Sequence, residues 1–148
     1  GPVDKGVPLG WDFDFWIQGE PASAKNQRRI VRVHGKPRII KSAKALAYKK
    51  SFDEQCPVLD EPITEDVAIL IDAYYASRRP DLACMDLIMD LLQGKIYQND
   101  RQVKASCSVW NLDRDNPRVR IRLRKMTVDA STGMSSYKLS EILGLTTD

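Results

Sequence analysis

Four aspartates in the middle of the chain have types and spacing suited to binding a metal ion. Asp86 and Asp90 are four residues apart, which places them on one face of a helix, and Asp81 lies just before that segment. Asp100 follows after a short turn, where the next apolar stretch begins. Ionised carboxylates that lie close together repel one another, which raises their pKa values. A bound divalent cation offsets this repulsion. Magnesium prefers one or two carboxylates plus water and phosphate oxygens, so the cluster predicts metal-assisted hydrolysis of a phosphodiester.

The same four residues also fit a purely structural role. Asp86 and Asp90 could form the solvent-facing side of an amphipathic helix, and Asp81 could be its N-cap. Asp100 could cap a turn. Spacing alone leaves both interpretations open.

Charge is segregated along the chain, although the net charge is only +3. Residues 25–50 contain ten basic residues and no acid, whereas residues 51–90 contain ten acids and two bases. Residues 91–126 return to nine bases and three acids. This pattern predicts a positive surface, suited to phosphate contacts, beside a carboxylate cluster.

Several other classes of protein are disfavoured. No apolar run approaches the roughly 20 residues of a membrane helix, and no signal-peptide pattern is present. Cys56, Cys84 and Cys107 are odd in number and widely spaced, which indicates free thiols rather than a zinc site or a disulfide framework. The single histidine, His34, has no Ser or Cys beside it in a setting typical of nucleophilic catalysis.

The elements that must position the aspartates follow from apolar periodicity. We expect a strand at 11–17, then a hairpin of strands at 29–34 and 38–40. Ser42 is a good N-cap for a helix of about 14 residues. The continuous apolar run at 67–75 predicts a central strand buried on both faces.

The second half of the chain completes the sheet. A helix is predicted at 83–93 with Gly94 as its C-cap, followed by strands at 103–112 and 118–126 joined by a turn. The last strand alternates apolar residues with four arginines, which either bind DNA or keep an edge strand soluble. The arginines are Arg118, Arg120, Arg122 and Arg124.

This order of elements predicts a single α/β (α+β) domain with a mixed β-sheet and two main helices packed on it. We assign residues 11–126 to the domain and residues 1–10 to a tag remnant and N-terminal extension. Residues 127–148 form a C-terminal tail with a turn near Gly133 and a short helix near 135–143. The aromatic residues are expected in the core or in a dimer contact; they include Trp11, Phe13, Phe15, Trp16 and Trp110.

Residues 13–126 resemble the RusA family of Holliday-junction resolvases. The family signature combines Asp-Leu-Asp-Asn, a helix ending in Asp-x-Leu, a Gly, and a turn into Asp-Asp-x-Gln-Val. It is matched by Asp81-Leu82, Asp90-Leu91-Leu92, Gly94 and Asn99-Asp100-Arg101-Gln102-Val103. Upstream, residues 19–29 and 41–48 resemble the segment after the first strand and the start of the first helix.

The resemblance implies a magnesium-dependent endodeoxyribonuclease, with manganese as an alternative ion. Such an enzyme resolves four-way junctions by paired symmetric nicks during DNA recombination and repair. It also implies a homodimer that binds branched DNA, without a membrane, in the cytoplasm of a bacterium or a phage-infected host. Asp81 and Asp100 correspond to metal ligands and Asp90 to a third acid, and we hypothesise that Asp86 joins them. The expected DNA contacts are Lys25, Arg28, Arg29, Lys41, Lys44, Arg78, Arg79 and Arg101.

The chain departs from the family pattern at two places. Ala83 stands where the family has a second Asp, and residues 84–93 contain no Lys or Arg to match the family's helix lysine. Asp86 could replace the missing carboxylate, Ala83 could be an engineered inactivation, or cleavage could be lost while binding is kept. Two other functions therefore stay open, a non-catalytic junction-binding module and a protein-interaction domain.

Overall fold

A four-stranded mixed sheet forms the centre of the computed structural model, which describes residues 10–23, 28–128, 131–133 and 135–136. The strand order is β1-β6-β4-β5, and β4 runs antiparallel to β6 and parallel to β5. β1 pairs antiparallel with the other side of β6. The strands span Phe13–Gln18 (β1), Val67–Tyr75 (β4), Val103–Leu112 (β5) and Arg118–Lys125 (β6).

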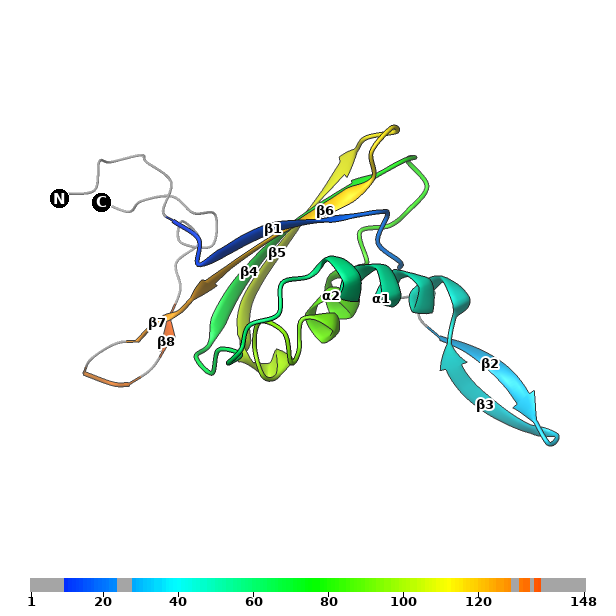
Figure 1. Cartoon of the computed structure of the whole chain (residues 1–148), viewed down its shortest axis with the longest axis horizontal. Helices are drawn as coiled ribbons and strands as arrows, with labels where there is room; N and C mark the ends of the chain where they lie inside the picture. The colour runs from blue at the N-terminus through cyan, green and yellow to red at the C-terminus, as the bar shows by residue number, and fades with distance from the viewer. Residues whose placement is uncertain (1–9, 24–27, 129–130, 134, 137–148) are drawn as a thin grey trace.

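Two helices cover one face of this sheet (Figure 1). The first, α1, spans Ala43–Gln55, and the hydroxyl of its N-cap Ser42 accepts a hydrogen bond from the Ala45 N–H, as predicted. The second, α2, spans Met85–Leu91. Burial of apolar side chains from both helices against the sheet provides the main driving force for this packing. The core includes Phe52, Leu87, Ile88, Ile71 and Ile121.

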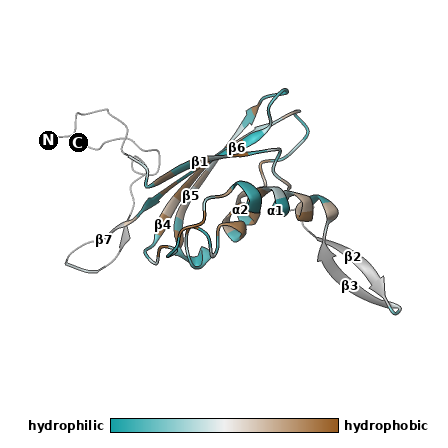
Figure 2. Cartoon of the chain, in the orientation of Figure 1, coloured by the Kyte–Doolittle hydropathy of each residue, from teal (hydrophilic) through white to brown (hydrophobic). Residues whose placement is uncertain are grey.

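The predicted central strand is confirmed as β4. Its first five residues, 67–71, are all buried, because helices cover one face and neighbouring side chains cover the other. Figure 2 shows the hydrophobic residues along this strand and hydrophilic residues in the loops at the ends of the sheet. A single α+β domain with a mixed sheet and two helices is therefore confirmed.

Shorter elements lie outside this body. β2 (Arg28–Val33) and β3 (Lys36–Lys41) form the predicted antiparallel hairpin, which extends away from the start of α1 (Figure 1). β7 (Thr127–Val128) pairs with β8 (Ser135–Ser136), so the prediction of a helix near 135–143 is wrong at its first two residues. Residues 137–143 lie outside the described part of the chain.

Three details differ from the sequence-based predictions. α2 is shorter than 83–93, and its C-cap is Leu92; Gly94 lies two residues further on, where a φ of +77° favours glycine. β5 and β6 flank β4 and do not pair with each other, although only five residues join them. β6 is therefore an interior strand, and the edge-strand explanation of its arginines is wrong.

Two further predictions can be compared with the described residues. Cys56, Cys84 and Cys107 are free thiols, as expected. Among the described helices, none is long and apolar enough to span a membrane.

Candidate active site

The loop of residues 76–84, which we call the Asp81 loop, joins the carboxyl end of β4 to α2. In open sheets with parallel strands, ligands bind beyond the carboxyl ends of the strands. β4, α2 and β5 form such a parallel unit, so this loop occupies the position typical of a site. Asp81 is exposed there, as are Arg78 and Arg79.

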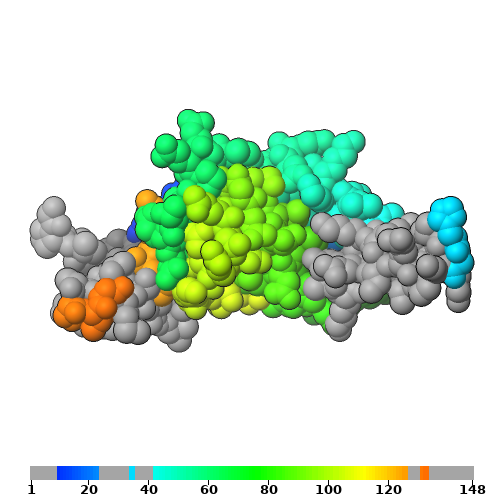
Figure 3. All heavy atoms as spheres, turned by 90° about the horizontal axis from the view of Figure 1, so that it is seen from below, coloured from blue at the N-terminus to red at the C-terminus, as the bar shows by residue number. Residues whose placement is uncertain are grey.

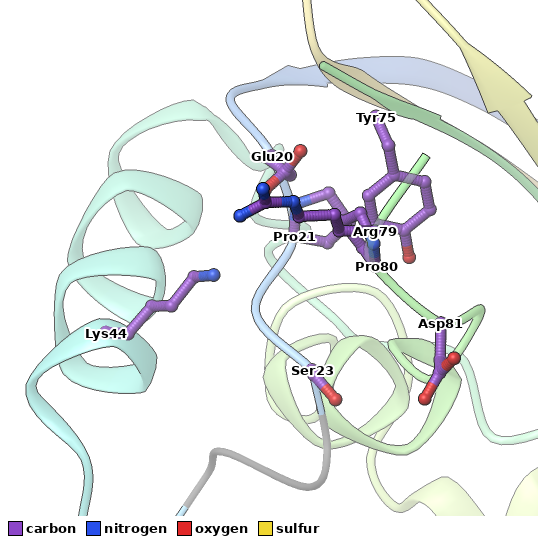
Figure 4. A pocket seen from close by; sticks show the side chains of 8 residues that line it. All are labelled: Glu20, Pro21, Ser23, Lys44, Tyr75, Arg79, Pro80 and Asp81. Atoms are coloured by element: carbon purple, nitrogen blue, oxygen red, sulfur yellow. The ribbon is translucent and has the colours of Figure 1, made fainter. Parts of the chain in front are cut away.

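A cavity of about 270 Å³ lies beside the Asp81 loop (Figure 4). Its walls come from the segment after β1, from α1 and from the loop itself. In Figure 4, Lys44 extends from α1 toward the cavity, and Ser23 and Asp81 lie on the other side. Two cations and two carboxylates therefore share one concave site. The lining residues are Glu20, Pro21, Ser23, Lys44, Tyr75, Arg79, Pro80 and Asp81.

The Gln93 side chain links the Asp90 carboxylate to the backbone of Asp100. The Gln93 amide donates to Asp90 Oδ1 at 2.8 Å, and its carbonyl oxygen accepts from the Asp100 backbone N–H at 2.9 Å. Both carboxylates also lie near buried Tyr97. Burial raises the pKa of the Tyr97 hydroxyl, and the charges of Asp100 and Asp90 raise it further. Tyr97 therefore remains a neutral donor, bonded to the Met89 carbonyl.

Gln102 fixes the turn that carries Asp100. Asp100, Arg101 and Gln102 form a single 3₁₀ turn capped by Asn99. The Gln102 side chain, only 8% exposed, donates to the carbonyls of Ile63 and Glu65 and accepts from the Asn99 N–H. Gln102, the Gln of the Asp-x-Gln-Val motif, therefore stabilises the turn in which the Asp100 backbone binds Gln93.

The predicted convergence of four aspartates is seen only in part. Asp81 lines the cavity, and Gln93 links Asp90 to the Asp100 backbone. Asp86 is exposed in the first turn of α2 and is absent from the cavity lining. Figure 3 shows the residues around α2 as a continuous surface beside α1. Within the described part of the chain, no group of three or more His, Cys, Asp or Glu residues is close enough together to hold a metal ion.

The donors in the cavity nevertheless fit a hard divalent cation. Asp81 supplies carboxylate oxygens and Ser23 supplies a hydroxyl, whereas the Glu20 carboxylate already accepts a hydrogen bond from the Ala76 N–H. Magnesium commonly needs only one or two protein carboxylates, since water and substrate phosphate complete its shell. Glu20 and Ser23 were not singled out from the sequence. The only signal for them was that residues 19–29 resemble the family's segment after the first strand.

The predicted DNA contacts fall into two groups. Lys44 and Arg79 line the cavity, Arg78 is exposed on the Asp81 loop, and Arg101 is exposed in the turn after α2. Arg28, Arg29 and Lys41 belong to the β2–β3 hairpin, where Arg28 pairs with Lys41 in the strand register. Lys25 lies outside the described residues.

The arginines of β6 project from the sheet face opposite the helices, which we call the open face. Arg120 binds both carboxylate oxygens of Asp14 at 2.9 and 2.7 Å, and Arg122 pairs with Asp72. Arg118 pairs with Asp113 and lies over the ring of Tyr74, 4.1 Å from its centroid. Each of these three guanidinium groups is neutralised by a neighbouring carboxylate, which weakens the case that they bind phosphate.

Comparison with known families adds one finding. The family model for the endodeoxyribonuclease RusA matches residues 18–124. This range includes the cavity, the Asp81 loop, α2 and the turn that carries Asp100. No individual curated protein matches the chain significantly.

Proposed function

The chain belongs to the RusA family of Holliday-junction endodeoxyribonucleases, and we propose that Asp81, in the cavity beyond β4, is the centre of its active site. The observation that supports this assignment most directly is the shared cavity of Asp81, Lys44 and Arg79. An acid that can hold a cation lies there with two bases that can hold a phosphate. Branched DNA is the substrate class that the family implies.

Four aspartates are proposed to serve a Mg²⁺ ion, which Mn²⁺ could replace. When bound, such an ion polarises the scissile phosphodiester and makes water a better nucleophile at neutral pH. Asp81 is the first candidate because of its cavity. Asp90 and Asp100 follow because Gln93 links the Asp90 carboxylate to the Asp100 backbone. Asp86 is the weakest candidate, since it belongs to neither group.

Basic side chains around the cavity are proposed to hold the DNA backbone. Lys44 and Arg79 are placed to contact phosphates next to the scissile bond, and Arg78 and Arg101 extend this surface. The β2–β3 hairpin would contact a more distant part of the junction, since it extends away from the body (Figure 1). Lys25 is proposed as a DNA contact from the sequence alone.

The test is single-turnover cleavage of a mobile four-way junction with and without Mg²⁺. We expect Asp81→Asn and Asp100→Asn each to reduce cleavage roughly a thousandfold, because a loss of about 4 kcal/mol of charge stabilisation corresponds to three factors of ten. Junction affinity should remain unchanged. Asp60→Asn is the control, since Asp60 is exposed in the loop after α1 and does not line the cavity. Full cleavage by either site variant would overturn the assignment.

Ala83 offers a gain-of-function test in the same assay. Its side chain is partly exposed, and its N–H donates to the Asp81 carbonyl at 3.0 Å, so a carboxylate there would lie beside Asp81. We expect Ala83→Asp to raise the cleavage rate if the natural acid is missing. An unchanged rate would favour a site that functions without an acid at this position.

We also propose that a homodimer makes paired symmetric nicks, in the cytoplasm of a bacterium or a phage-infected cell. The open face is the surface we assign to the second copy. Trp16 on β1 and Val109 on β5 are 39% and 40% exposed there, on the two strands at the edges of the sheet. The arginines of β6 that lie between these strands are already ion-paired. Light scattering should show a dimer that Val109→Glu dissociates and Val58→Glu, at an exposed site elsewhere, does not. If Val109→Glu remains dimeric, the interface lies elsewhere.

A further inference from the structure

Two side chains from other parts of the fold hold the backbone of the Asp81 loop, and we propose that both are positioning residues for Asp81. Glu20 lies after β1, and its carboxylate accepts a hydrogen bond from the Ala76 N–H at 3.0 Å. Trp110 lies on β5, and its indole N–H donates to the Pro80 carbonyl at 3.0 Å. This inference rests on the function proposed above.

The two contacts hold the start of the loop and the peptide group directly before Asp81. Ala76 is the first residue after β4, so Glu20 sets the direction in which the chain leaves the sheet. Pro80 precedes Asp81, so Trp110 holds the peptide group that joins these two residues. Together the contacts restrict both the start of the loop and the backbone at Asp81.

The residues at the two ends of the Asp81 loop are also packed in the core. Tyr75 is the residue before the loop and Cys84 is its last residue, and both belong to the buried core. Tyr75 stacks on Trp110 with ring centroids 5.6 Å apart and an interplanar angle of 18°. Trp110 packs against the buried core, so the indole that binds Pro80 is itself held in place.

This arrangement suits a loop that must present one carboxylate accurately. Exposed loops are ordinarily mobile, and a displacement of about 1 Å in a catalytic group can cost a hundredfold in rate. Residues that orient metal ligands from behind typically change metal affinity or activity by about 10 to 100-fold when mutated. Glu20 and Trp110 meet that description, since neither is among the four aspartates assigned to the ion.

The first experiment uses the hydrogen-bonding difference between two substitutions of Glu20. Glu20→Gln keeps an oxygen that can accept from Ala76, and Glu20→Ala removes it. In the metal-free full chain, amide exchange at Ala76 should be about tenfold faster in Glu20→Ala than in wild type and near normal in Glu20→Gln. Glu54→Ala, at an exposed position on α1, should change nothing.

Cleavage should follow the same order. We expect Glu20→Ala to lose about 10 to 100-fold in rate at unchanged junction affinity and Glu20→Gln to stay within about threefold of wild type. If Glu20→Gln loses as much as Glu20→Ala, the charge of Glu20 is needed at the ion and the positioning role is overturned. If neither variant changes exchange or cleavage, the role is also overturned.

The second experiment changes Trp110→Phe, which keeps an aromatic ring beside Tyr75 and removes the N–H that binds Pro80. Amide exchange across residues 76–84 should accelerate, and the Mg²⁺ concentration for half-maximal cleavage should rise about tenfold, with cleavage recovering at excess Mg²⁺. A general loss of stability would lower Tm without moving that concentration. Unchanged exchange, or unchanged Mg²⁺ dependence, would overturn the role of Trp110.

These results can be separated from a failure of the proposed function. The exchange measurements need neither metal nor DNA, so they report the loop contacts whether or not the chain cleaves junctions. An active Asp81→Asn variant would instead remove Asp81 from the active site while leaving the exchange results intact.

Discussion

The two faces of the central sheet both carry basic side chains, but these meet different partners. On the helix-covered side, Lys44 and Arg79 line a cavity, and no ion pair of either is seen among the described residues. On the open face, Arg120 and Arg122 are paired with Asp14 and Asp72 from the neighbouring strands. A phosphate can therefore be bound at the cavity without displacing a carboxylate, whereas on the open face it would have to compete with one.

This difference shows why basic residues in a sequence cannot be assigned to DNA binding by count. The alternation of four arginines along β6 suggests a cationic ladder. The strands on either side of β6 place Asp14 and Asp72 diagonally across from these arginines, and the resulting pairs belong to the sheet itself.

The largest expected effect is on the free energy of unfolding when an ion pair of the open face is broken. Asp72→Ala leaves Arg122 without its carboxylate at a site where both side chains are less than one-fifth exposed. We expect a loss of about 2 kcal/mol in the free energy of unfolding, somewhat below the cost of breaking a fully buried pair. Asp86→Ala, at an exposed position, should stay within about 0.5 kcal/mol. Urea unfolding measures both free energies. Equal losses in the two variants would contradict the prediction that the Asp72–Arg122 pair stabilises the fold.

A smaller effect is expected in the salt dependence of junction binding. Each cation that contacts a phosphate contributes about one to the slope of log affinity against log salt concentration. Lys44→Ala and Arg79→Ala should therefore each lower the slope by about one, whereas Arg120→Ala should leave it unchanged because Asp14 already occupies Arg120. Fluorescence anisotropy at several salt concentrations measures the slope. A lower slope for Arg120→Ala would show that the open face binds DNA.

The smallest effect should appear in acid. Hydrogen bonding to Arg120 holds the pKa of the Asp14 carboxyl below its ordinary value of 3.8. A lowered folded-state pKa stabilises the protein above the unfolded pKa, and that stability is lost as pH falls through the folded value. Because the pair is partly exposed, its contribution is about 0.5 kcal/mol. Unfolding between pH 5 and 2 should show this loss in wild type and not in Asp14→Asn.

Much of the fold could be predicted from local pattern. The apolar run 67–75 is too hydrophobic for an exposed strand, and it became the buried strand β4. Ser42 caps α1 as expected because its hydroxyl satisfies a helix N–H that has no other partner. Strand order was not predictable, since the short connection between β5 and β6 suggests a hairpin. Instead β4 lies between them and hydrogen-bonds to both.

The site was predicted less completely than the fold. Spacing and family resemblance indicated Asp81, Asp90 and Asp100, and in the structure Gln93 links the Asp90 carboxylate to the Asp100 backbone. Whether the four aspartates hold one ion remains a prediction. Glu20 and Trp110 could not be found from spacing, because the residues they bind are 56 and 30 positions away along the chain.

The sequence by itself determined which acids and bases are present, where the strands and helices form, and that the chain resembles a nuclease family. These properties depend on residue types and short-range periodicity. Only the tertiary structure decided which charges meet. It paired Arg118, Arg120 and Arg122 of β6 with carboxylates and left Lys44 and Arg79 at a cavity beside Asp81. It also brought Glu20 and Trp110 to the loop behind that aspartate. Charge pairing depends on distances in space, which the order of residues along the chain does not specify.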